Sequence, residues 1–165
     1  LYHRLLEEEI KRLKGEEVKE EVVPEIHLPA QAYLPQGYIE DEGERLIIYK
    51  RLSQIRGEGE IEEMREELRD RYGPLPQEAQ DLLELVRLKV SLQRYGVERF
   101  QMKGGEVQLR LLPGGGDPQR LLTLLQQGGY RLTPEMTLIF PTEGKGWKEV
   151  AQQAKRILQE LFPGV

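Results

Sequence analysis

The first part of the chain changes from a helical to a non-periodic pattern of apolar positions. Residues 1–14 carry apolar side chains at spacings of three to five, which places them on one stripe of a helix that Gly15 ends. The acidic stretch over residues 15–25 lacks this periodicity and contains Pro24, which is typical of a solvated linker. We therefore expect a domain boundary in this linker, with a separate domain over residues 26–165.

Residues 25–39 carry alternating apolar positions, but prolines interrupt them at positions 29 and 35. Because proline cannot donate a hydrogen bond to a neighbouring strand, this segment cannot be a central strand of a sheet. The pattern predicts an extended segment that lies across the surface of the domain and pairs briefly at a sheet edge. We expect Tyr33, Tyr38 and Ile39 to hold it in place.

Three helices are predicted in the middle of the chain. The first runs from a cap at Asp41 to about residue 55, and its apolar residues cover more than one face, so we expect it to be largely buried. The second spans residues 60–72 and ends where Gly73 and Pro74 follow. The third, residues 77–95, is apolar on nearly every side and is the expected central core helix.

The last third of the chain alternates short strand patterns with helical ones. Two pairs of strands are joined by tight turns, which indicates antiparallel hairpins, and a helical pattern follows each pair. The predicted class is α+β, with N-terminal helices followed by β-β-α-β-β-α and a small antiparallel sheet. The expected strands are residues 97–102, 107–111, 130–132 and 137–140, and the expected helices are residues 118–127 and 146–162.

Charge and composition narrow the range of functions. The net charge is −5, and residues 1–72 hold 19 acidic against 12 basic side chains, a balance that suits docking on a basic protein surface better than sequence-independent DNA binding. No apolar run approaches the length of a membrane span. Cysteine is absent, which excludes disulfides and thiol chemistry. Asparagine is absent too, and this combination favours a thermophilic bacterial protein of the cytoplasm.

Patterns that would indicate catalysis or cofactor binding are weak. The only Gly-Lys pair, at residues 144–145, lacks the earlier glycine of a phosphate-binding loop. The glycines at 114–116 precede Asp117 and Pro118, a pairing more typical of a capped helix start than of a phosphate site. The two histidines lie on different predicted elements, and neither serine has a histidine near it. We therefore expect no catalytic residue, metal site or cofactor within this chain.

The helix predicted over residues 60–72 carries an acidic stripe separate from its apolar one. Glu60, Glu63, Glu67 and Asp70 fall on one face at ~100° per residue. In one interpretation this face is only solvated, with Glu67 paired to Arg71 one turn later. In the other it docks arginine side chains, which carboxylates hold with two hydrogen bonds. The residues alone favour the first interpretation.

Three stretches resemble the C-terminal domain of the bacterial transcription-repair coupling factors, the Mfd family. They are residues 28–39 (LPAQAYLPQGYI), 45–52 (RLIIYKRL) and 66–76 (EELRDRYGPLP), in the family's order and spacing. Residues 1–14 are similar to the C-terminal helix of the family's preceding motor domain. The chain departs from the family pattern at Gln36 and Gly37, where acidic residues are frequent, and at His27.

The resemblance implies a regulatory domain without enzymatic activity of its own. Full-length members are ATP-dependent double-stranded-DNA translocases, with ATP and magnesium bound in the motor, that displace stalled RNA polymerase and recruit UvrA. Their C-terminal domain docks on an N-terminal UvrB-like module and masks the UvrA-binding surface. The docking residues match Glu67 and Asp70 here, which reverses the preference for a merely solvated face. Two alternatives remain: a module that binds DNA or RNA polymerase directly, and a structural cap on the motor.

Overall fold

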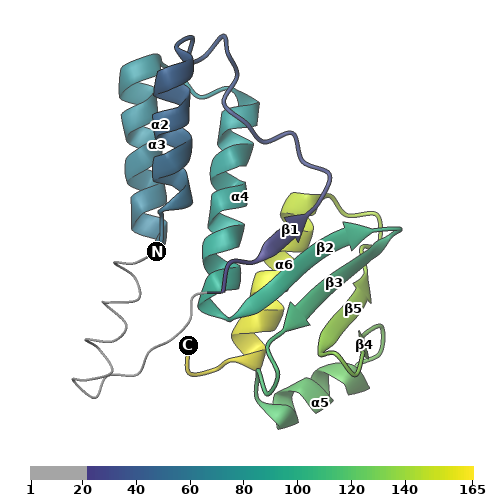
Figure 1. Cartoon of the computed structure of the whole chain (residues 1–165). Helices are drawn as coiled ribbons and strands as arrows, with labels where there is room; N and C mark the ends of the chain where they lie inside the picture. Colours follow the sequence, from purple (N-terminus) through teal and green to yellow (C-terminus); the bar gives the residue numbers. More distant parts are fainter. Residues whose placement is uncertain (1–21) are drawn as a thin grey trace, which may run out of the picture.

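A computed structural model describes residues 22–165 of the chain (Figure 1). The helix expected over residues 1–14 and most of the linker expected over 15–25 lie outside the described residues. The described part has a helical half and a half built on a β-sheet, which confirms the α+β class. Its elements are β1 (Glu25–His27), α2 (Glu42–Ser53), α3 (Glu58–Tyr72), α4 (Gln77–Arg94), β2 (Val97–Lys103), β3 (Glu106–Leu111), α5 (Pro118–Gln126), β4 (Arg131–Leu132), β5 (Thr137–Pro141) and α6 (Trp147–Leu161).

The five strands form one sheet in the order β1-β2-β3-β5-β4. Strands β2 to β5 pair antiparallel as expected, but β1 runs parallel to β2, with Ile26 opposite Phe100, so the sheet is mixed and not purely antiparallel. Sequence reasoning identified β1 as an edge segment but could not give its direction. Pro24 and Pro29 bracket it, which explains why only three residues pair.

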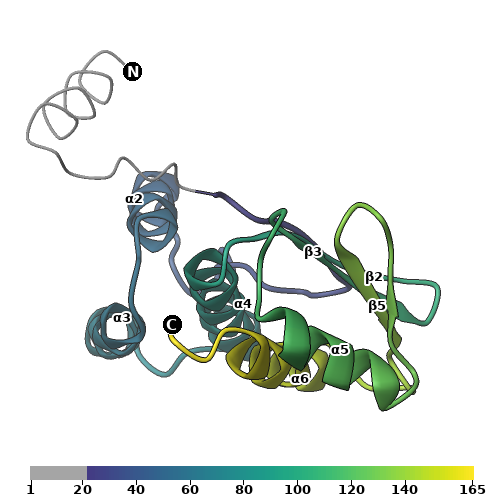
Figure 2. The same cartoon turned by 90° about the horizontal axis from the view of Figure 1, so that it is seen from below.

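One core lies between the sheet and its helices. Figure 2 shows α4, α5 and α6 on the same side of the strands. Alternate residues of β3, at positions 107, 109 and 111, face this core and are almost completely buried, whereas the residues between them are partly or fully exposed. The largest fully buried side chains of this core include Phe100 of β2 and Phe140 of β5.

A second core joins α2, α3 and the N-terminal part of α4. Ile48, Ile61, Leu68 and Leu83 are its largest fully buried side chains from these three helices. Helix α4 contributes to both cores, since residues 79–90 pack mainly among α2 and α3, while Leu88 and Leu92 pack against the sheet core. This double role explains why the helix is apolar on nearly every side and confirms its expected central place.

The expectation that the first predicted helix would be largely buried is wrong. In α2 only Ile48 and Leu52 are buried, whereas Leu46 is 63% exposed and Ile47 is 60% exposed. Helix α2 lies at the edge of the molecule beside α3 (Figure 1), so one stripe of it meets the core and the opposite side faces solvent. The cap at Asp41 is confirmed, because its carboxylate accepts a hydrogen bond from the backbone N–H of Glu44.

Residues 28–39 cross the surface from the sheet to the helical half, as the prolines indicated. Ile39 is 1% exposed and the Tyr38 hydroxyl lies within hydrogen-bond distance of two α3-end carbonyl oxygens, so both hold the segment as expected. Tyr33 holds the segment through its backbone and not through its side chain. Its side chain is 46% exposed, and only its backbone N–H binds, to the carbonyl oxygen of Glu78 at 3.2 Å.

Candidate functional site

Helix α3 carries an acidic face that shares Glu63, Glu67 and Asp70 with the stripe predicted from the sequence, but Glu66 replaces Glu60, whose carboxylate accepts a hydrogen bond from the backbone N–H of Arg56. It starts at Glu58, two residues before the predicted start, because Gly57 and not Gly59 precedes the first turn. Burial of Ile61, Met64 and Leu68 turns the opposite side of the helix towards solvent. Four carboxylates project there within an arc of about 100°, at ~100° per residue. We call these four residues the acidic face: Glu63, Glu66, Glu67 and Asp70.

Glu67 is half-buried and already bound within the domain. Its carboxylate accepts two hydrogen bonds from the guanidinium of Arg51 on α2, the longer of which joins Nη2 to Oε1 at 2.8 Å. Arg71, one turn along α3, lies 3.5 Å from Oε2. The hydrogen bonds from Arg51 hold the pKa of the Glu67 carboxyl below its ordinary value, and they raise the pKa of Arg51.

The sequence analysis anticipated the contact with Arg71 but missed Arg51. The two residues of the Arg51–Glu67 pair are 16 positions apart and belong to different helices, so no helical periodicity relates them. An arginine near the end of α2, followed by a short connection to an acidic helix, is the only signal that could have suggested it. The pair ties α2 to α3 at the edge of the acidic face.

Asp70 is exposed and occupies a different electrostatic setting. Its carboxylate makes no ion pair and no side-chain hydrogen bond with any residue between 22 and 165. It also lies in the last turn of α3, where the partial negative charge of the helix terminus disfavours a carboxylate. Glu67 and Asp70 are three residues apart and share one face, so the structure brings the two predicted docking residues together with unequal freedom to bind a partner.

Two tyrosines fix the end of α3 that carries this pair. The Tyr38 hydroxyl lies 2.8 Å from the carbonyl oxygen of Gly73 and 3.1 Å from that of Leu68, and the two oxygens share its single O–H donor. The Tyr72 hydroxyl donates to Glu44 of α2 at 2.8 Å. Burial is the first cause of the raised pKa of both hydroxyls. The acidic face is therefore held on a rigid support from two sides.

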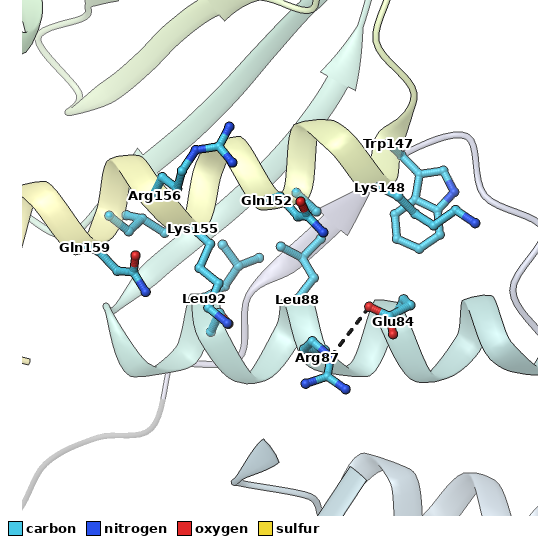
Figure 3. Close-up of a pocket in the computed structure, with 13 residues that line it drawn as sticks. Glu84, Arg87, Leu88, Leu92, Trp147, Lys148, Gln152, Lys155, Arg156 and Gln159 are labelled. Atoms are coloured by element: carbon cyan, nitrogen blue, oxygen red, sulfur yellow. Dashed lines mark ion pairs between the residues drawn. The ribbon is translucent and has the colours of Figure 1, made fainter. Parts of the chain in front are cut away.

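A groove of about 570 Å³ runs between α4 and α6 (Figure 3). Leucines form part of its lining, and four cations belong to it: Arg87, Lys148, Lys155 and Arg156. Three of these cations bind carboxylates within the domain, at 2.7 Å for Arg87 with Glu62, 2.9 Å for Lys148 with Asp81 and 2.8 Å for Lys155 with Glu58. The hydrogen bond from Lys155 holds the pKa of Glu58 below its ordinary value. The pairs of Lys148 and Lys155 link α6 to α4 and α3, and the Arg87 pair links α4 to α3.

The other features considered in the sequence have local structural roles. Asp117 caps α5 by accepting hydrogen bonds from the backbone N–H groups of residues 119 and 120, which confirms the helix-cap interpretation of this connection. His27 lies 3.6 Å from the carboxylate of Glu25. Within residues 22–165, no three His, Cys, Asp or Glu side chains gather in a way that could hold a metal ion. No helix in this described range has the length and apolar character needed to cross a bilayer.

Comparisons with known proteins agree with this architecture. Residues 28–117 match the family described as the TRCF domain. A transcription-repair-coupling factor of Myxococcus xanthus is 34% identical over 167 residues, which cover 98% of this chain and 14% of that protein. The namesake of Escherichia coli K12 is 32% identical over 170 residues, covering 98% of this chain and 15% of that protein.

A solved structure gives the same result for the fold. The crystal structure of a C-terminal domain of transcription-repair coupling factor superposes with a TM-score of 0.77 and 25% identity, covering 89% of this chain and 96% of that one. The chain spans about a seventh of the length of the curated relative from Myxococcus xanthus. The family match covers more than half of the chain and includes both Glu67 and Asp70. The chain therefore belongs to the TRCF family, as a C-terminal domain of a transcription-repair coupling factor.

Proposed function

We propose that this domain is an autoinhibitory latch within a bacterial, cytoplasmic, ATP-dependent DNA translocase that displaces stalled RNA polymerase and recruits UvrA. In this proposal the acidic face docks on an N-terminal UvrB-like module of the same protein and masks its UvrA-binding surface. ATP and magnesium are bound by the motor, and this domain contributes regulation and no catalytic group. Its only direct partner is the module, and it reaches UvrA, RNA polymerase and DNA indirectly.

The observation that carries the proposal is the excess of unpaired negative charge on the acidic face. Of its four carboxylates, only Glu67 has an ion-pair partner among residues 22–165. Four anions crowded on one exposed arc repel one another, and Asp70 adds an unfavourable interaction with the end of the helix. A cationic surface on another domain would relieve both costs. Arginine fits best, because its planar guanidinium holds carboxylates with paired hydrogen bonds.

The two predicted docking residues have different roles in this mechanism. Asp70 offers a carboxylate free to accept a partner's guanidinium, which makes it the stronger attachment point. Glu67 already shares its oxygens between Arg51 and Arg71, so a third guanidinium approaching it meets two like charges. Glu67 therefore supports docking mainly through its position beside Asp70, and Arg51 competes with the partner for it.

A latch must hold the resting state and still open when the protein engages RNA polymerase. Ion pairs that stay exposed to water contribute about 0–1 kcal/mol each, whereas a charged hydrogen bond that docking shields from water contributes about 1.5–3 kcal/mol. A tether within one polypeptide raises the effective concentration of these contacts into the millimolar range for a short linker. A coupling free energy of about 1–3 kcal/mol would alter UvrA recruitment roughly 5–150-fold. This range suits a switch that a competing contact can release.

Charge reversal of the pair in the full-length protein tests the latch. We expect Glu67→Lys combined with Asp70→Lys to increase UvrA binding and basal ATPase activity, while circular dichroism reports an intact fold. Glu160→Lys is the matched control, because Glu160 is an exposed carboxylate in the last turn of α6, away from the acidic face. Unchanged UvrA binding by a folded double variant would show that the acidic face is not the latch.

Direct binding to DNA or RNA polymerase is the main alternative, and it is motivated by the slightly basic second half of the chain, which includes the cations of the α4–α6 groove. Three of the four are neutralised by carboxylates of this domain, and the net charge of −5 opposes phosphate binding. A mobility shift of DNA by the isolated domain at low salt that disappears at high salt would favour this alternative. We expect no shift. A destabilised motor with otherwise unchanged activities after deletion would instead favour a structural cap.

A further inference from the structure

Helix α2 exposes two adjacent aliphatic side chains that the fold does not use. Leu46 is 63% exposed and Ile47 is 60% exposed, while Ile48 and Leu52 supply the contacts of this helix with the core. Single exposed apolar residues are common on protein surfaces, whereas apolar surface rimmed by polar residues is typical of interaction sites. We call Leu46 and Ile47 the apolar pair.

The apolar pair borders the acidic face. Ile47 lies three residues after Glu44, which binds Tyr72 of α3, and four residues before Arg51, which binds Glu67. Residues at these spacings follow one edge of a helix, so Ile47 lies on the edge of α2 that runs beside α3. Figure 1 shows the two helices side by side. Leu46 extends the apolar surface outward from this edge.

We propose that the apolar pair is the second half of the docking surface, and that the partner presents an aliphatic side chain next to its arginines. The inference rests on the proposed function, because it assigns the partner chemistry to the same N-terminal module. Charge complementarity supports this occupant. The unpaired carboxylates of the acidic face call for a cationic partner, and the apolar pair beside them calls for an apolar group on the same partner surface.

The two halves of the surface contribute different kinds of binding energy. Ion pairs at the rim of an interface weaken as salt screens them and mainly set the rate of association. Burial of aliphatic groups is insensitive to moderate salt and slows dissociation. A surface with both predicts docking that falls with salt to a finite residual affinity, and not to zero.

The test is a calorimetric titration of the 165-residue chain against the separate N-terminal module at two salt concentrations. Leu46→Gln combined with Ile47→Gln removes the apolar pair without harming the helix, because glutamine has a higher helix propensity than isoleucine. The matched control is Leu122→Gln, since Leu122 is 49% exposed on α5, far from α2 (Figure 1). Thermal unfolding of each variant establishes that the domain is folded.

We expect the apolar double variant to bind about tenfold more weakly at both salt concentrations, with an unchanged salt dependence, and the control to bind as the parent does. The inference is overturned if the apolar variant keeps full affinity while Glu67→Lys with Asp70→Lys loses it, an outcome that leaves the latch itself intact. It is also overturned if sedimentation shows that the parent chain forms a dimer and that the apolar double variant does not. Unchanged binding by both variants would reject the proposed function together with the inference.

Discussion

Replacement of Asp70 by asparagine has opposite effects on docking and on stability if the acidic face works as proposed. The substitution keeps the size of the side chain and removes its charge. Asp70 has no ion-pair partner between residues 22 and 165 and lies in the last turn of α3, so nothing in the described domain stabilises its charge. Removal of the charge should therefore stabilise the free domain while it removes the best attachment point for a partner arginine.

The position of Asp70 at the end of α3 and its lack of a partner indicate how large the changes in stability and in docking should be. A carboxylate at a helix C-terminus costs about 0.3–1 kcal/mol, so Asp70→Asn should raise the free energy of unfolding by that amount and the melting temperature by about 1–4 °C. A hydrogen bond to a charged group contributes about 1.5–3 kcal/mol, so loss of the Asp70 charge should weaken docking by about 10–150-fold.

Glu67→Gln should show the reverse pattern. The Arg51–Glu67 pair is about 35–43% exposed, which places its contribution at roughly 0.2–1 kcal/mol of folding stability, and this is the amount that the variant should lose. Because Arg51 already neutralises Glu67, docking should weaken by no more than about fivefold. Glu160→Gln controls for the helix-terminus effect, since it should stabilise the domain in the same way as Asp70→Asn without altering docking.

Chemical denaturation and calorimetric titration against the N-terminal module measure the two quantities on the same three variants. We expect Asp70→Asn to be more stable and to bind worse than the parent, whereas Glu67→Gln should be less stable and bind nearly as well. A larger loss of affinity for Glu67→Gln than for Asp70→Asn would refute the assignment of Asp70 as the main attachment point. Equal affinities for both variants and the parent would remove the acidic face from the interface.

Three further predictions concern the Tyr38 hydrogen bond, the pH dependence of the Arg51–Glu67 pair and the thermal stability of the domain. Tyr38→Phe deletes the hydroxyl that binds the end of α3 and should lower the free energy of unfolding by about 0.5–1.5 kcal/mol in urea denaturation, with no change indicating that the bond is not made in solution. The pKa of Glu67 is lowered in the folded domain, so its pair with Arg51 adds stability above the ordinary pKa of glutamate, and this stability is lost as pH falls through the pKa of the folded state. The difference in the free energy of unfolding between the parent and Glu67→Gln should therefore disappear in acid. A difference that persists at pH 2 would contradict the ion pair as its cause. The absence of Cys and Asn leads us to propose a thermophilic source, so calorimetry should give a melting temperature above the ~45–65 °C range of mesophilic domains, and a value inside that range would reject it.

Most of the fold could be predicted from the sequence because helix ends and turns are determined by residues close to them in the chain. Prolines and glycines mark the ends of the helices, hairpin turns mark the strand pairs, and the all-round apolar pattern of α4 identified it as the central helix. The direction of β1 was beyond such signals, since nothing in three residues says whether their partner strand runs parallel. The exposure of α2 was predicted wrongly because apolar content shows what a helix could bury, and not how many neighbours it has.

The candidate site was likewise predicted only in part. Helical spacing placed Glu67 and Asp70 on one face without any tertiary information. The difference between them depends on Arg51, which reaches Glu67 from another helix, and on the end of α3, whose charge acts on Asp70. Only the packing of α2 against α3 makes these influences visible, and the same packing brings Ile47 to the border of the acidic face.

The central claim is that the acidic face of α3 binds a basic surface of the N-terminal module reversibly. The most direct measurement is a binding titration of the 165-residue chain against that module at low and at moderate salt, with the parent and with the charge-reversed Glu67→Lys, Asp70→Lys variant. We predict binding that weakens as salt rises and is lost in the folded variant. Binding that survives the charge reversal, or no binding by the parent at low salt, would contradict it.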